Sequence, residues 1–232
     1  CVPVLLQQVS LGASIQRVKL VDPCLCILRN VTKLNADMQL AQEQLRTGEV
    51  VKYGSNSGGV DTTKIFTCGI HLLADYMREN PRSWACIKPL LGIVRTLALN
   101  PLNAQTLHSH DIIRWVMQVL FHAYSEIQRR TNNGLSVPAN LAALLRVEEV
   151  SLLDVVDLCA ASLACFAKEP ASQLHMEQMD CIGFFVKLFY TISIASVHKA
   201  GARLLAELAV NPVCAQSIEK EAGLHQFVQA HF

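Results

Sequence analysis

The chain has 232 residues, of which 51% are hydrophobic and only 6% aromatic, a composition that suits helices packed on helices around a large buried core. Its formal net charge of +1 excludes a protein whose whole surface is an electrostatic footprint for nucleic acid. The nine cysteines are an odd number without the close spacing of a disulfide framework, which favours a reducing compartment inside the cell.

Apolar periodicity in the first part of the chain predicts a series of helices separated by turns. The first helices are expected over residues 1–18, 23–31 and 36–47. Residues 48–63 are rich in glycine and serine and are interpreted as an insertion. Helical periodicity returns over 64–77 and over 84–99, where Pro89 is expected to kink or restart the helix.

The second part of the chain begins with a short helix over 104–108, and a long helix over 112–128 follows Asp111, a residue suited to an N-cap. Four side chains of the long helix are expected to point inward: Trp115, Met117, Leu120 and Phe121. Residues 129–150 are interpreted as a second insertion with at most a short helix. Further helices are predicted over 152–167, 170–179, 182–191, 197–210 and 212–222.

One apolar position recurs along this pattern, because each of four residues closes an apolar helix just before a polar or proline break: Val31, Leu97, Phe166 and Leu208. The spacings are 66, 69 and 42 residues. The last matches the roughly 40–47 residues of an armadillo or HEAT unit, and the others match one unit plus about 25 residues. We therefore predict an all-α, right-handed superhelical armadillo solenoid of three-helix units.

The predicted units divide the chain as one armadillo array. They cover 1–33 (partial), 34–99 with the insertion 48–63, 100–168 with the insertion 129–150, 169–210, and 211–232 (partial). Because both end units are incomplete, we expect the chain to be a piece of a longer array.

The third helices of such units line a concave groove that can hold an extended peptide. The position nine residues before each recurring apolar residue holds Asp22, Lys88, Asp157 and Lys199, and the position two before it holds Arg29, Arg95, Ala164 and Ala206. These two positions are seven residues apart and therefore share a helix face.

This helix face would carry a row of cations suited to acidic partner segments, interrupted by two acids. The cations are Arg29, Lys88, Arg95 and Lys199. Asn30 and Thr96, next to the recurring apolar residue, could hydrogen-bond a partner's backbone. The alternative is that each charge is an ordinary solvated helix charge.

Other residue patterns carry little chemistry. Cys68 and His71 lack a second nearby pair of zinc ligands, and the loop 54–59 lacks the Gly-Lys-Ser/Thr ending of a phosphate loop. Serine and cysteine nucleophiles have no evident histidine and acid partners. No stretch reaches the roughly 18 apolar residues of a membrane span. We expect no catalysis, metal or cofactor, no membrane insertion and no direct contact with nucleic acid.

Three stretches resemble the second half of the armadillo domain of the β-catenin family: SWACIKPLLGIVRTLALNPLNAQTL, then EIQRRTNNG, then RVEEV. The resemblance implies groove cations at Arg29, Lys88 and Arg95, which in that family contact cadherin tails, T-cell-factor-type transcription factors and destruction-complex scaffolds. It also implies roles in cell adhesion and in Wnt signalling with transcriptional coactivation, at cell junctions, in the cytoplasm and in the nucleus.

The chain departs from the family at several binding positions. Asn30 stands for a histidine, Leu34 for an arginine and Gln173 for a basic residue, so binding of some partners is expected to be weakened or altered. Two alternatives remain open, namely a paralogue specialised for adhesion or signalling alone and a generic armadillo scaffold. A nuclear-import receptor would carry repeated Trp-x-x-x-Asn pairs, but Trp84 precedes Lys88 here.

Two positions match regulatory sites of the family. Tyr190 matches a tyrosine whose phosphorylation loosens cadherin binding. The kinase target after Arg129-Arg130 is broken, because Asn132 replaces the expected serine and leaves Thr131 as the acceptor. Both residues are candidate phosphorylation sites, and the alternative role for Tyr190, compatible with the first, is that of a packed aromatic side chain at the end of its helix.

Overall fold

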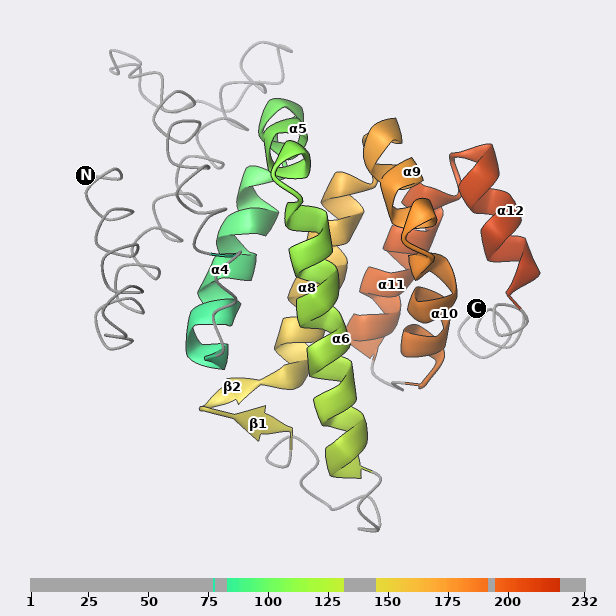
Figure 1. Cartoon of the computed structure of the whole chain (residues 1–232). Helices are drawn as coiled ribbons and strands as arrows, with labels where there is room; N and C mark the ends of the chain where they lie inside the picture. Colours follow the sequence, from blue (N-terminus) through green and yellow to red (C-terminus); the bar gives the residue numbers. More distant parts are fainter. Residues whose placement is uncertain (1–76, 78–82, 132–144, 192–194, 222–232) are drawn as a thin grey trace, which may run out of the picture. The chain divides into compact units, whose positions relative to one another are not determined.

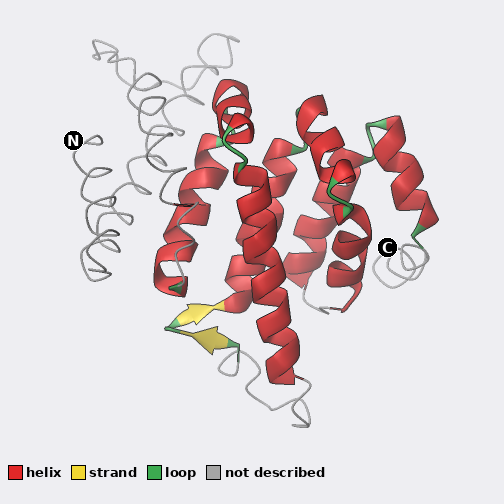
Figure 2. Ribbon diagram, viewed as in Figure 1, coloured by secondary structure: helices red, strands yellow, loops and turns green. Residues whose placement is uncertain are grey.

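The structure is a computed structural model that describes residues 77, 83–131, 145–191 and 195–221. The described residues are almost entirely helical, with one small strand pair (Figure 1, Figure 2). The predicted helices over 1–18, 23–31 and 36–47, the insertion 48–63 and Val31 lie outside the described residues. The chain divides into two compact units, Cys1–His110 and Asp111–Phe232.

The first unit contains α4 (Trp84–Leu97) and α5 (Pro101–Ser109). α4 continues through Pro89 without a break, so the predicted restart is wrong. A proline inside a helix forfeits one backbone hydrogen bond. The fully buried Leu90, Leu91 and Val94 compensate for that loss, because they fix the apolar side of α4 in the core.

The second unit begins with α6 (Ile112–Thr131), and the next described helix is α8 (Leu152–Phe166). The next three helices are α9 (Pro170–Gln178), α10 (Cys181–Thr191) and α11 (Ala195–Leu208), where helices were predicted over 170–179, 182–191 and 197–210. α12 (Pro212–Lys220) follows.

The helices of the second unit form two layers. α8 packs against α6 and α11, and α10 packs against α11, α9 and α12. Figure 1 shows α6 and α10 in front of α8 and α11. The centre of this unit contains Phe166 and Phe185, both fully buried.

The recurring apolar position marks helix ends as predicted. Leu97, Phe166 and Leu208 are the last residues of α4, α8 and α11. Their side chains are 5%, 0% and 0% exposed. The helices end there because a proline follows within four residues in each case and opens the next helix.

The segment 129–150 differs from its prediction in the part that the structure describes. α6 extends to Thr131, and residues 145–151 contain a two-stranded antiparallel hairpin that was not predicted, β1 (Arg146–Val147) and β2 (Val150–Ser151). The rest of the segment, 132–144, lies outside the described residues. The turn residues Glu148 and Glu149 have φ values of 49° and 64°. Positive φ at both turn positions matches the twist of paired strands.

The side chains predicted to face inward on α6 divide into two groups. Trp115 and Leu120 are buried and Met117 is half-buried, but Phe121 is 57% exposed. The prediction for Phe121 is wrong because the buried stripe of α6 follows Val116, Leu120 and Ile127 instead, and Phe121 lies beside it.

Asp111 precedes α6, and its carbonyl oxygen accepts a hydrogen bond from the Trp115 N–H at 3.3 Å. Its backbone is left-handed, with φ 60°, unlike the extended backbone of an ordinary N-cap. The Asp111 carboxylate forms an ion pair with the Arg114 side chain at 2.9 Å.

Candidate partner-binding face

Two of the predicted groove cations share one face of α4. Lys88 and Arg95 are seven residues apart, and Arg95 is exposed while Lys88 is half-buried. The hydroxyl group of Thr96 donates to the Gly92 carbonyl oxygen of the same helix at 2.8 Å. A partner's backbone would therefore have to compete with this internal hydrogen bond.

The equivalent positions of the second unit differ in accessibility. Lys199 is exposed on α11, whereas Asp157 on α8 is half-buried. Ala164 is fully buried because α8 lies between α6 and α11, whereas Ala206 on α11 is exposed. The third helices thus do not present both sequence positions equally to solvent.

The remaining predicted site residues fall at helix ends or outside the described part. Arg29 and Asn30 lie outside the described residues. Tyr190 lies in α10, and its side chain is not among those described. Thr131 is the last residue of α6, is exposed, and donates its hydroxyl hydrogen to the Ile127 carbonyl oxygen at 3.0 Å.

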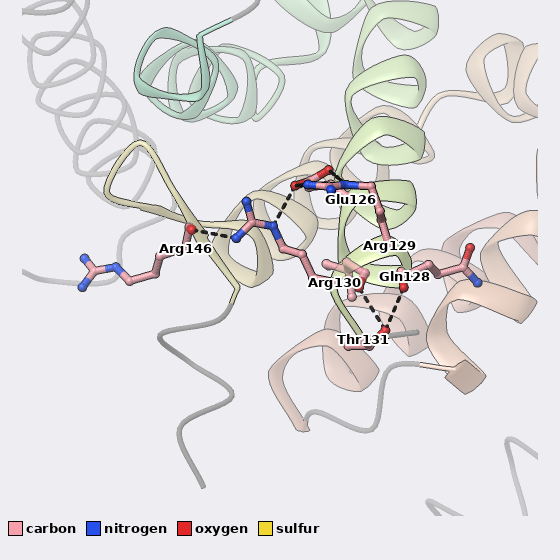
Figure 3. A network of polar contacts seen from close by, with 7 residues as sticks. Glu126, Gln128, Arg129, Arg130, Thr131 and Arg146 are labelled. Carbon is pink, nitrogen blue, oxygen red and sulfur yellow. Dashed lines mark hydrogen bonds and ion pairs between the residues drawn. The ribbon is translucent and has the colours of Figure 1, made fainter. Parts of the chain in front are cut away.

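A polar cluster at the end of α6, shown in Figure 3, was not predicted. Glu126 accepts hydrogen bonds from Arg129 at 2.9 and 2.7 Å and from Arg130 at 2.7 Å. These bonds to the two guanidinium groups lower the pKa of Glu126 to about 2. Arg130 also donates to the Arg146 carbonyl oxygen at 3.2 Å and so fastens the hairpin to α6. The spacing Glu-x-x-Arg-Arg was the available sequence signal.

Gln173 has an internal structural role that sequence reasoning missed. Its side chain is 5% exposed, and its amide nitrogen donates to the Ala167 carbonyl oxygen at 2.7 Å and the Glu207 carbonyl oxygen at 2.9 Å. These carbonyls belong to the ends of α8 and α11. One buried amide group therefore caps two third helices.

The described cysteines are free and buried, at positions Cys86, Cys159, Cys165, Cys181 and Cys214. Burial raises the pKa of Cys181 to about 11 and also raises the pKa of Cys159. Such thiols are poor nucleophiles because the reactive thiolate is disfavoured. Within the described residues, no group of three histidine, cysteine or acidic side chains could hold a metal ion.

Comparison with known proteins gives matches over most of the chain. It is 24% identical over 202 residues to junction plakoglobin of Sus scrofa, which covers 87% of this chain and 23% of the relative. It is 27% identical over 205 residues to catenin beta of Urechis caupo, which covers 88% of this chain and 22% of the relative. Human junction plakoglobin matches at 24% over 202 residues. No protein-family model matches the chain.

The helical units and these matches define the class of the protein as an all-α armadillo solenoid. Within that class, the matches to junction plakoglobin and catenin beta support a divergent member of the β-catenin family. It spans about a quarter of the length of the curated relatives that it matches. None of the helices in the described ranges is long and apolar enough to cross a membrane.

Proposed function

We propose that this chain is part of a non-enzymatic, catenin-like scaffold that binds acidic extended segments along its third helices. The observation that carries the proposal is the placement of Lys88 and Arg95 on one face of α4, opposite the side that Leu90 and Val94 bury. Each exposed cation contributes about 1 kcal/mol or less to such binding, so affinity arises from several contacts together. Arg29 and Lys199 are proposed as further members of the row.

The proposed partners follow from the resemblance to the β-catenin family and from the charge of this face. They are the cadherin cytoplasmic tail, T-cell-factor-type transcription factors and destruction-complex scaffolds, which would give the protein roles in adhesion and in Wnt signalling. The proposed locations are cell junctions, the cytoplasm and the nucleus. A paralogue that serves only adhesion or only signalling is the second candidate, because Gln173 is an internal cap rather than a basic contact residue.

Regulation by phosphorylation is proposed at Tyr190 and Thr131. A phosphate on Thr131 would add negative charge at the C-terminal end of α6, where the helix dipole disfavours it. It would also compete with Glu126 for Arg130, the residue that fastens the hairpin.

The test of the proposed function is calorimetric titration of the chain with an acidic cadherin-tail peptide and with a T-cell-factor peptide. The double variant Lys88→Glu and Arg95→Glu is expected to weaken binding by at least about tenfold while the helical content stays unchanged. Lys168→Glu with Lys220→Glu is the matched control, because both lysines are exposed and lie outside α4. Equal affinity of the two double variants would refute the proposal.

A further inference from the structure

A cleft of about 350 Å³ lies between α6 and α10 in the second unit. Its apolar wall consists of Met117 and Phe121 on α6, Phe184 on α10 and Met179 just before α10. The rings of Phe121 and Phe184 lie 5.8 Å apart, yet Phe121 is 57% exposed. A large aromatic side chain left exposed beside a cleft is typical of a binding surface, and the volume is at the lower end for ligand sites.

The α6–α10 cleft lies apart from the proposed groove cation of this unit. α6 and α10 form one layer, and α8 and α11 form the other (Figure 1). Lys199 belongs to α11. An occupant of the cleft therefore leaves Lys199 available to a second partner.

The shape of the cleft favours a helix as its occupant. On α6, Met117 and Phe121 are four residues apart and share one face. Arg129 lies eight residues beyond Phe121, on the side of α6 bounded by Arg114 and His122, which also line the cleft. On α10, Phe184 lines the opposite wall. A third helix fits the groove between two helices with side chains spaced three and four residues apart. Methionine side chains adapt to the shape of such a partner.

The charges along the cleft set the direction of that helix. Asp180 lies at the end of the cleft where α10 begins. The negative charge of Asp111 at the same end is balanced by its ion pair with Arg114. Arg129 lies eight residues beyond Phe121, or about 12 Å along α6. Its side chain is 64% exposed, and it shares the Glu126 carboxylate with Arg130, so the Arg129 guanidinium group stays accessible to a partner's acid.

From this arrangement we propose that the α6–α10 cleft docks an amphipathic helix of a partner protein, acidic in its first turn and basic in its last. The apolar middle of the helix enters the cleft beside Phe121. The acidic turn meets Arg129, and the basic turn meets Asp180. This charge order also suits the partner helix itself, because acids near the first turn and bases near the last complement the helix dipole.

Methionine-methyl NMR on the full chain tests the proposal, because two of its five methionines line the cleft. The probe is a synthetic amidated helix of about four turns. It has two glutamates in the first turn, leucines at i, i+3 and i+4 in the middle, and two lysines in the last turn. A second peptide has the charged ends exchanged. We expect saturable shifts of the Met117 and Met179 methyl signals, and unchanged signals from Met77 and Met176, which are 0% exposed.

Two substitutions separate the apolar contact from the charged contact. Phe121→Ser is expected to weaken binding by about tenfold, and Arg129→Gln by about threefold. Unchanged Met77 and Met176 signals in both variants show that the fold is intact. The peptide with exchanged ends is expected to bind the unaltered chain more weakly than the first peptide does. The two peptides are expected to bind Arg129→Gln with equal affinity.

Three results would overturn the proposal. The first is the absence of any shift at Met117 and Met179. The second is equal binding of the two peptides to the unaltered chain. The third is binding of the first peptide to Phe121→Ser that is as tight as its binding to the unaltered chain. Shifts that depend on protein concentration without peptide would also overturn it, because a second copy of the chain would then occupy the cleft.

Discussion

Replacement of Gln173 by leucine should destabilise the second unit by about 2–3 kcal/mol. The side chain is 5% exposed, and its two amide hydrogens reach the carbonyl oxygens of Ala167 and Glu207. Leucine has a similar size but donates no hydrogen bond. A buried carbonyl left without a donor costs about 1–3 kcal/mol. The Glu207 carbonyl is less deeply buried than that of Ala167, so water recovers part of its loss.

Urea unfolding measured by tryptophan fluorescence provides the assay. The two tryptophans lie in different compact units, Trp84 in the first and Trp115 in the second. In a Trp84→Phe background, the fluorescence therefore follows the unit that contains Gln173. Circular dichroism on the same samples shows whether secondary structure is lost in the same transition.

The matched control is Gln178→Leu, which makes the same exchange on the same helix at an exposed position. It should change the free energy of unfolding by less than about 0.5 kcal/mol. If the two variants unfold at the same urea concentration with the same slope, the capping role assigned to Gln173 is wrong.

Two further predictions concern single side-chain contacts. The pKa of Glu126 is lowered from 4.5 to about 2, so its contribution to stability is full above pH 4.5 and is lost as the pH falls toward 2. Glu126→Gln should remove this part of the acid dependence, and an unchanged pH profile of the melting temperature would contradict it. A Cβ atom on Gly183 would lie 2.6 Å from the Glu221 carboxylate, at the end of a flexible side chain. Gly183→Ala should therefore stabilise a Glu221→Ala protein by about 0.5 kcal/mol and the unaltered protein by less, as a double-mutant cycle can measure.

The helices and their ends could be predicted from sequence because their signals are local. Leu97, Phe166 and Leu208 end their helices where a proline soon follows, and this pattern is visible in neighbouring residues. The α-helical class depends on the same periodicity, which packing then confirms.

The features that sequence reasoning missed depend on contacts between distant segments. Gln173 bonds to Glu207, 34 residues away, and nothing in its own helix indicates that contact. Phe121 resembles a core residue by type, but its exposure is determined by how α6 packs on α8. The β1–β2 hairpin has a non-glycine turn, so the usual glycine signal for a hairpin was missing.

The candidate groove was only partly accessible to prediction. The shared face of Lys88 and Arg95 follows from helix geometry alone. The burial of Ala164 at the equivalent position of α8 cannot be predicted from helix geometry, because it depends on the packing of α8 against α6 and α11.

The hydrogen bond between Arg130 and the Arg146 carbonyl has a consequence for how the sequence can change in length. It holds the end of α6 next to the start of β1, so the two described segments on either side of 132–144 lie close together. Doubling the length of such a closed segment costs only about 0.6 kcal/mol. New sequence, including an affinity tag or a reporter peptide, can therefore be accommodated there while α6 and α8 keep their packing.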